Sequence, residues 1–381
     1  MKLLVIYPGD PLPEGKDGLS KIIQFVPSEI KADVLCFGTK MVEHRFNQII
    51  SVPQYNPSGI NLMRRWLSSF SPKDVCLLND WMDEVSKFLE EKGEEYDVIH
   101  IVSSALSPLI AITPPELSSK MILSSVDAMS MLFERRARFI GLIKGLPLLV
   151  ESVKWREIEK RYGKCFPINH VVSSVDKKYL EHQGLNNVFA LPNGVIPVKP
   201  GLKAANPRII FWGDLGYAPN KAAAEFIVRE IAPLVKIPVV LIGRGEQVAN
   251  PPSNVQYLGF VDDLYGSISD QDIFLSPMFF GSGLKNKMLE AMMLGLPIIA
   301  SQITTHGIPV QDGVDCYILD DDNSNQWQQR IEQVLNRWPT EMIARSKELV
   351  ETSFSWDQRR EQMLSKYFEI IHMRREEKRK L

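Results

Sequence analysis

Short apolar runs alternate with segments of helical periodicity along the whole chain. Such runs, bounded by turn residues, are typical of buried parallel strands, and the segments between them are typical of amphipathic helices. In the first half we predict strands at 3–7, 32–37, 96–102 and 120–127, and two more that begin at residues 169 and 188. In the second half we predict strands at 208–213, 238–243, 255–261, 273–276, 296–301 and 313–319.

The predicted helices are mainly at 20–26, 60–89, 131–162, 221–234, 262–268, 284–294, 324–338, 340–352 and 356–380. This alternation predicts an α/β protein with a parallel, doubly wound sheet in each half. Residues 195–207 carry three prolines and few hydrophobic residues, so we place the linker there and expect domains at 1–196 and 197–355. The cleft between two such domains is the default ligand site.

Composition narrows the class of protein. The content is 45% hydrophobic and 24% charged, as in globular proteins. A net charge of -2 gives no overall basic field, which argues against nucleic acid as a partner. The four cysteines form no C-x-x-C pair, so we expect neither a zinc site nor a disulfide framework, as in a reducing cytosol. No run of about 20 apolar residues suggests a membrane span, and the apolar N-terminal run is too short for a signal peptide.

The segment 277–297 carries the strongest chemical signal. Gly281 and Gly283 follow an apolar strand and open the helix predicted at 284–294, and Gly295 suits the end of that helix. A glycine turn at a helix N-terminus offers backbone N–H groups and the positive end of the helix dipole, a combination that suits phosphate.

Three charged side chains follow this turn. Lys285 and Lys287 add positive charge, and Glu290 lies one to two turns inside the helix, where a carboxylate could accept hydrogen bonds from sugar hydroxyls. From this segment alone, a tight turn without a ligand, with both lysines facing solvent, is an equally good interpretation.

The first half offers weaker candidates. The Gly- and Pro-rich loop at 8–19, which includes Gly18, could meet an anionic ligand or be an ordinary connection. Asp127 ends a predicted strand, where ligands of open α/β sheets collect, although a helix N-cap would explain it equally well. We interpret His100, inside its strand, as a packed core residue.

The segment 131–162 mixes apolar residues with many basic ones. One interpretation is a basic amphipathic surface that lies on anionic lipid. The other, which we favour, is a pair of helices with an apolar core face and a solvated charged face. We also interpret the basic end of the last helix as a solvated tail.

Taken together, these motifs resemble the GT-B glycosyltransferases, specifically glycosyltransferase family 4 (glycosyl transferases group 1). The resemblance covers nearly the whole chain. It is carried by Leu-Pro-Asn-Gly at 191–194, Phe-Trp-Gly at 211–213, Ala-Pro-Asn at 218–220, Leu-Ile-Gly-Arg-Gly at 241–245, Leu-Gly-Phe-Val-Asp-Asp at 258–263, the segments 281–291 and 295–301, and Phe-Ser-Trp at 354–356.

The resemblance implies two Rossmann-like domains that face a cleft, with the last helix, 356–381, packed back on the first domain. The donor would bind the second domain and the acceptor the first. The sugar would be transferred with retention of its anomeric configuration, without a bound metal and with no cofactor besides the nucleotide-diphospho-sugar substrate. The leaving diphosphate would then be stabilised by helix N-termini and lysines.

Matched residue by residue, the resemblance places the diphosphate at Gly283, Leu284 and Lys285 and the ribose at Glu290. The implied catalytic residues are Asp127 and Lys285. The remaining donor-side positions are Gly18, Gly213, Lys221, Gly243, Phe260, Val261 and Ser282.

Some positions depart from the family pattern. Ser282 replaces the first glutamate of the family's E-x7-E motif, a residue that often touches the transferred sugar. Asp214 stands where the family commonly has arginine, and Lys221 is a loose match for a partner lysine. Asp127 stands near a histidine of many members, where it could orient a hydroxyl of the acceptor or of the sugar.

We therefore expect a retaining glycosyltransferase of the hexosyltransferase type, acting in polysaccharide biosynthesis. Its acceptor would be a glycan, a lipid-linked sugar or a small molecule. Two alternatives remain: a nucleotide-sugar epimerase or hydrolase on the same fold, and a non-catalytic nucleotide-sugar binding protein. We expect a cytoplasmic location, with peripheral contact at the inner face of the membrane left open, and no nucleic acid partner.

Overall fold

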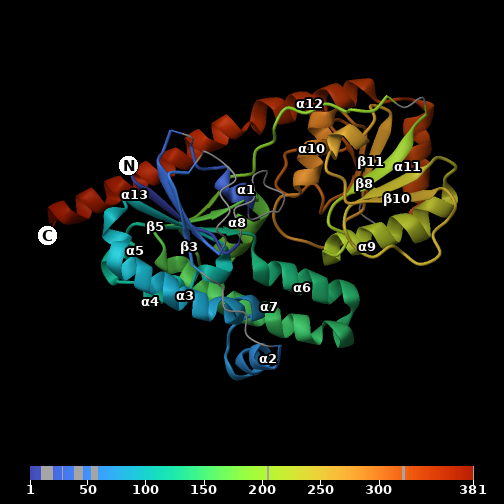
Figure 1. The fold of residues 1–381 in the computed structure, drawn as a ribbon. Coiled ribbons are helices and arrows are strands. Elements are labelled where there is room, and N and C mark those ends of the chain that lie inside the picture. The colour runs from blue at the N-terminus through green and yellow to red at the C-terminus, as the bar shows by residue number, and fades with distance from the viewer. Residues whose placement is uncertain are drawn as a thin grey trace. The chain divides into compact units, whose positions relative to one another are not determined.

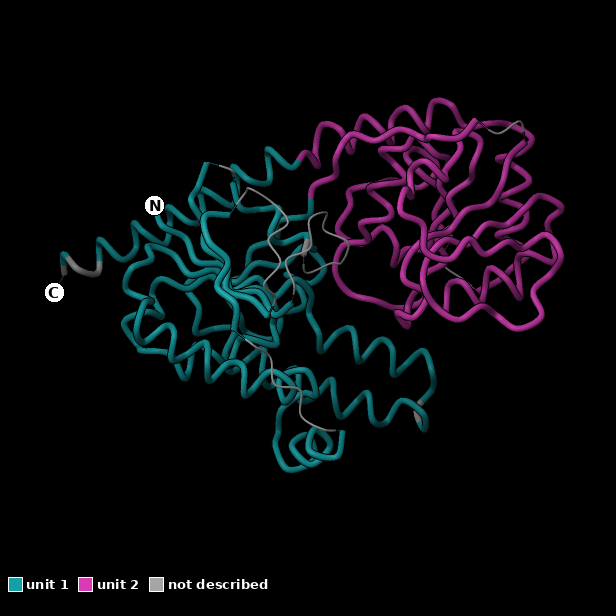
Figure 2. Tube along the Cα trace, viewed as in Figure 1, with its two compact units in different colours: residues 1–193, 356–381 teal, residues 194–355 magenta. Residues whose placement is uncertain are grey.

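The computed structural model describes residues 1–9, 20–27, 29–37, 46–52, 59–203, 206–319 and 322–380. Two compact units divide the chain, one formed by residues 1–193 and 356–381 and the other by residues 194–355 (Figure 2). Gly18 lies outside the described residues. Within the described residues, no helix is long and apolar enough to cross a membrane.

The first unit is built on a seven-stranded parallel sheet of order β3-β2-β1-β4-β5-β6-β7 (Figure 1). Its strands are β1 (Leu3–Ile6), β2 (Ala32–Cys36), β3 (Gln48–Ser51), β4 (Val98–Val102), β5 (Met121–Val126), β6 (Ile168–Val171) and β7 (Val188–Ala190). Its α-helices are α1 (Ser20–Ile23), α2 (Gly59–Ser68), α3 (Lys73–Lys92), α4 (Leu109–Ile112), α5 (Pro115–Ser118), α6 (Met129–Ile140), α7 (Leu142–Tyr162), α8 (Ser174–His182) and α13 (Trp356–Lys380).

The second unit repeats this plan with a six-stranded parallel sheet of order β10-β9-β8-β11-β12-β13. Its strands are β8 (Arg208–Trp212), β9 (Val239–Ile242), β10 (Val255–Gly259), β11 (Asp272–Ser276), β12 (Ile298–Ser301) and β13 (Tyr317–Leu319). Its α-helices are α9 (Ala218–Phe226), α10 (Asn286–Leu294), α11 (Ser324–Asn336) and α12 (Thr340–Ser353), and α9 continues into π and 3-10 turns up to Leu234. Both sheets have the Rossmann order, in which the strand order reverses next to the first strand.

The central strands are apolar on both faces because helices cover both sides of each sheet. All residues of β1, β4 and β5 are buried. His100 is one of them, with no exposed surface, so its interpretation as a packed core residue is confirmed. It bonds the Tyr367 hydroxyl at 2.8 Å, and this contact fastens α13 to the first sheet.

The structure differs from the predicted elements in several details. The edge strand β3 was not predicted. The segment 131–162 forms two helices separated by Gly141, whose φ is 89°. Helix α10 begins at Asn286, two residues later than predicted. The N-caps of α8 and α11 are Ser173 and Asn323, whose side chains accept backbone N–H bonds.

Candidate functional site

The candidate site lies at the switch point of the second sheet. Strands β8 and β11 are neighbours there, and their chains leave the sheet in opposite directions toward β9 and β12. Open α/β sheets bind ligands beyond the carboxyl ends of their strands at this point. The loops concerned begin at Gly213, after β8, and at Pro277, after β11.

Glycines let the backbones at this edge approach closely. A Cβ on Gly243 would lie 1.7 Å from the carbonyl oxygen of Gly213, and one on Gly213 would lie 2.9 Å from Lys287 Nζ. Both glycines have positive φ, 145° and 147°. The loops after β8 and β9 therefore touch through bare backbone, and Lys287 lies directly against the first of them.

Lys287 links α10 to α9 beside the loop after β8. Its Nζ donates to Asn220 Oδ1 at 2.6 Å, and Asn220 in turn donates to the Asp214 carbonyl. The same ammonium lies 4.3 Å from the ring centre of Phe211. Burial, reinforced by the nearby charge of Lys285, lowers the pKa of Lys287 to about 7. An anion bound beside this amine would favour its charged form and raise its pKa.

Lys285 and Ser282 define the turn before α10. Lys285 Nζ donates to the carbonyls of Ser282 and Gly283, at 2.6 and 3.2 Å. Lys285 occupies the N-cap position of α10, and no side chain caps that helix end. The Ser282 hydroxyl is buried and has no hydrogen-bond partner in the described structure. Because a buried hydroxyl without a partner is costly, it is a candidate contact for a ligand.

Glu290 lies in the same region. Its Oε2 accepts a hydrogen bond from Trp212 Nε1 at 3.1 Å. Burial, followed by the charge of Glu290, raises the pKa of Tyr265, so this tyrosine also lies near the carboxylate. Trp212, Tyr265 and Asn220 were not predicted as site residues, although Trp212 and Asn220 belong to the motifs that carry the resemblance.

Other predicted donor residues lie on neighbouring loops. Phe260 is 48% exposed, and the Arg244 guanidinium lies 4.2 Å from its ring centre, so the two form a stacked pair after β9 and β10. Val261 follows and is partly buried, whereas Leu284 is buried. Lys221, the loose match for the family's lysine in the loop after β8, forms a largely exposed ion pair with Glu246 at 3.2 Å. The lysine that lies against this loop is Lys287.

Asp127 belongs to the other unit. It follows β5 directly after Val126, whose φ of 68° is unusual for a β-branched residue. Ala128 occupies the N-cap of α6, so Asp127 does not fill the capping position considered for it. Ser103, after β4, also has a positive φ, 99°. Strained residues collect at functional edges of sheets, so this edge remains a candidate for binding.

The described residues hold no cluster of three or more His, Cys, Asp or Glu side chains that could bind a metal ion. The donor set around α10 consists instead of two amines, one hydroxyl and one carboxylate. Such a set suits an anion and hydroxyl groups.

The fold of the whole chain and the sequence of its second unit agree with the predicted resemblance. Two parallel α/β sheets of Rossmann order form the GT-B fold. Residues 206–337, which hold every donor-side position named here except Gly18, match the family model described as Glycosyl transferases group 1. The predicted resemblance is confirmed by this match. No curated protein matches the chain.

Solved structures of the same fold align over nearly the whole chain. Sucrose-phosphate synthase from Thermosynechococcus elongatus is 15% identical with a TM-score of 0.72, and the alignment covers 98% of this chain and 99% of that one. HepE from Anabaena, solved with UDP and glucose, is 12% identical with a TM-score of 0.66, covering 96% and 99%. WaaG, a glycosyltransferase involved in lipopolysaccharide biosynthesis, is 13% identical with a TM-score of 0.66, covering 95% and 98%. At these identities the likeness shows the fold.

Proposed function

We propose that the protein is a retaining glycosyltransferase that uses a nucleotide-diphospho-sugar. The observation that carries this proposal is the group of Ser282, Lys285, Lys287 and Glu290 around the uncapped end of α10. The site offers positive charge and an unpartnered hydroxyl where a diphosphate can bind, and a carboxylate one turn further on for sugar hydroxyls.

The leaving group sets the chemical problem. The bond between the anomeric carbon and the diphosphate oxygen breaks, a bond to the acceptor oxygen forms on the same face of the sugar, and the acceptor's hydroxyl proton passes to the leaving diphosphate. Charge grows on the diphosphate as that bond breaks, and Lys285, Lys287 and the first turn of α10 stabilise it. No step of this scheme requires a metal ion.

A uridine nucleotide is the first donor to test. HepE was solved with UDP-glucose, and it shares the fold over 96% of this chain. The exposed ring of Phe260, stacked on Arg244, offers a flat surface for the base, with Val261 beside it. Ser282 in place of a carboxylate would alter which sugar hydroxyls are recognised.

The acceptor belongs to the first unit in this proposal, and Asp127 would orient its hydroxyl. We propose a glycan, a lipid-linked sugar or a small molecule as acceptor, within polysaccharide biosynthesis. All four cysteines are free thiols, which supports a cytoplasmic location. We also propose peripheral contact with the inner face of a membrane.

The test is a thermal-shift panel of UDP-, GDP- and ADP-sugars, followed by turnover assays with and without acceptors. A donor that binds the native state raises the apparent stability, and donor consumption is expected only when an acceptor is present. Turnover without acceptor would indicate a hydrolase or epimerase, and binding without turnover a non-catalytic protein. Activity that EDTA abolishes would contradict the metal-independent scheme.

A further inference from the structure

Two helices of the first unit expose apolar stripes. The exposed side chains are Ile60, Met63, Leu67 and Phe70 on and just after α2, and Ile143, Leu146, Val150 and Val153 on α7. The three residues on α2 have the spacing i, i+3, i+7 and the four on α7 the spacing i, i+3, i+7, i+10, which places each set on one side of its helix. Ile143 is 94% exposed and Ile60 75%. A stripe with this spacing ordinarily packs on a core, so two exposed stripes indicate an external partner.

Helix α2 is held against α7 by specific bonds. Trp66 Nε1 donates to Glu151 Oε2 at 2.7 Å, and the Lys154 ammonium donates to the Trp66 carbonyl and lies 4.5 Å from its ring centre. Helix α2 therefore contacts α7 through these residues. The exposed stripe of α2 is thus a fixed feature of the first unit.

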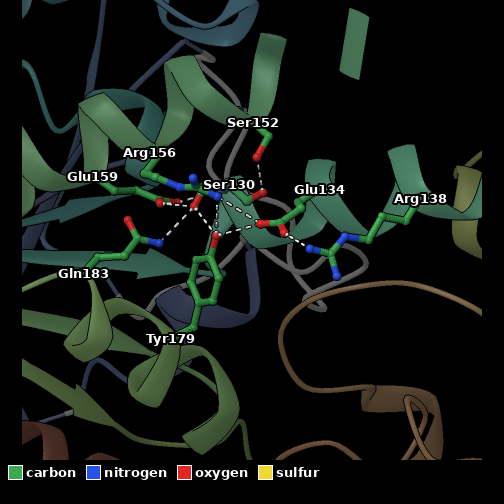
Figure 3. A network of polar contacts seen from close by, with 8 residues as sticks. All are labelled: Ser130, Glu134, Arg138, Ser152, Arg156, Glu159, Tyr179 and Gln183. Atoms are coloured by element: carbon green, nitrogen blue, oxygen red, sulfur yellow. Dashed lines mark hydrogen bonds and ion pairs between the residues drawn. The ribbon is translucent and has the colours of Figure 1, made fainter. Parts of the chain in front are cut away.

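The base of the α6–α7 pair is fixed by a buried polar network (Figure 3). Glu159 accepts from the Ser130 backbone N–H at 3.0 Å and also from the Ser130 hydroxyl. Arg156 donates to Glu134 at 2.9 Å, and Tyr179 of α8 donates to the same carboxylate. These bonds hold both helices where they meet the sheet, while the exposed residues lie toward the turn at Gly141.

Basic side chains predominate beside the α2 stripe and beside the first half of the α7 stripe. Residues 135–150 include four basic and no acidic side chains, and residues 59–70 include two arginines and no acidic side chain, in a chain whose net charge is -2. Arg138 pairs with Glu134 and Arg65 with Asp80. Apolar stripes flanked mainly by basic residues are typical of helices that lie in the surface of an anionic bilayer.

We propose that the exposed stripes of α2 and α7 dock on a membrane surface rich in anionic lipid. The apolar side chains enter the headgroup region, and Arg64, Arg136 and Lys144, which make no ion pair in the described structure, contact lipid phosphates. This inference rests on the membrane contact proposed above and names the surface that makes it. Lipid binding needs neither donor nor acceptor, so vesicle binding and glycosyl transfer can fail independently.

The test is co-sedimentation of the full-length protein with vesicles of phosphatidylcholine, alone or with an equal part of phosphatidylglycerol. We expect binding to the anionic vesicles only, weakened by salt. The variant Met63→Ser/Leu67→Ser/Ile143→Ser/Leu146→Ser should bind at least about tenfold more weakly, because less apolar area enters the lipid. The control Ile112→Ser/Leu335→Ser removes exposed apolar side chains elsewhere and should bind as the wild type does.

A second variant, Arg64→Gln/Arg136→Gln/Lys144→Gln, keeps the apolar stripes and should also lose binding to anionic vesicles. Equal melting temperatures of all variants would show that the fold is kept. The proposal is overturned if the wild type stays in the supernatant or if the four-serine variant binds as tightly as the wild type. It is also overturned if the wild type, but not that variant, forms dimers without lipid, since a second copy would then cover the stripes.

Discussion

The indole of Trp212 donates from Nε1 to Glu290 Oε2 at 3.1 Å, joining the end of β8 to helix α10. This bond orients the carboxylate proposed to bind the ribose. We expect Glu290→Ala to weaken binding of the preferred nucleotide-sugar by about 1.5–3 kcal/mol, because sugar hydroxyls lose a charged acceptor. Isothermal titration calorimetry measures the change.

Trp212→Phe serves as the graded control. It keeps the aromatic ring against Phe274 but removes the indole donor, so it should weaken donor binding by about 0.5–1.5 kcal/mol, less than Glu290→Ala does. Donor affinity unchanged in Glu290→Ala would contradict the ribose assignment, whatever the effect at Trp212.

We expect donor binding to depend on pH because of Lys287. Its pKa of about 7 leaves it partly neutral at neutral pH, and a bound diphosphate favours the charged form. Donor affinity should therefore rise as the pH falls toward about 7, by up to about tenfold per pH unit above the pKa. Protons should be taken up when the donor binds. Calorimetry in buffers of different ionisation enthalpy measures this uptake.

Lys287→Met should abolish the proton uptake and weaken donor binding at the lower pH. The control is Lys236→Met, which removes an exposed lysine of the second unit that belongs to none of the donor-side positions. Equal proton uptake by the Lys287 variant and the wild type would show that another group titrates.

Gly243 offers a test of the backbone contact at the site. In Gly243→Ala the added methyl would overlap the Gly213 carbonyl at 1.7 Å, so the loops after β8 and β9 must separate. Gly259→Ala is the control, since it also has a positive φ, 65°, but meets no atom within 4 Å. The control should cost about 1–2 kcal/mol of unfolding free energy and Gly243→Ala clearly more. Equal losses in urea unfolding would contradict the close approach.

Periodicity predicted most of the fold because parallel strands buried on both faces are continuous apolar runs. The exception, β3, has only two apolar residues among four and lies at the sheet edge, where neither face is well covered. The end of α10 at Leu294 was predicted correctly because Gly295 adopts the left-handed conformation that ends the helix, φ 72° and ψ 40°.

The candidate site could be predicted only in part. Glycines and charges near 281–290 are visible in the sequence, but the directions of side chains in an irregular loop are not. Lys285 bonds carbonyls of its own turn, whereas Lys287 reaches Asn220, 67 positions away in the chain. The Trp212–Glu290 bond spans 78 positions. Such pairs are set by strand order, which local spacing does not specify.

Two buried histidines predict acid sensitivity. Burial lowers the pKa of His100 to about 3, with His170 adding to the effect, and lowers that of His170 to about 4. The unfolded chain has the ordinary value of 6.5, so below it the unfolded state binds protons that the folded state does not. The free energy of unfolding should therefore fall as the pH drops below about 6.5, by up to about 1.4 kcal/mol per pH unit for each histidine.

His100→Gln tests this origin of the acid sensitivity. The variant should be less stable at neutral pH, because the bonds to Tyr367 and Ser124 are disturbed, but its stability should fall less steeply with acid. His182→Gln, at an exposed helix end, should keep the wild-type slope. Urea unfolding at several pH values gives the slopes, and a slope unchanged in His100→Gln would mean that carboxylates alone cause the acid sensitivity.

The buried Glu159 should change the free energy of unfolding with pH in the opposite sense, as a loss of stability at higher pH. Burial raises its pKa from 4.5 to about 7, although hydrogen bonds from Ser130 oppose the shift (Figure 3). Between these values the folded state keeps a proton that the unfolded state releases, so this contribution to stability is full below about 4.5 and is lost as the pH rises through about 7. Glu159→Gln is neutral throughout and should remove this decline, while Glu157→Gln, at an exposed position of α7, should retain it.

Glu159→Ala separates the charge of this residue from its hydrogen bonds. It leaves the Ser130 backbone N–H and hydroxyl without their acceptor in a buried place, at a cost of about 1–3 kcal/mol. The loss should appear in urea unfolding at every pH, because it does not depend on titration. If Glu159→Gln and the wild type gave the same dependence of unfolding free energy on pH, the carboxylate would titrate near its ordinary value, and burial would not control its charge.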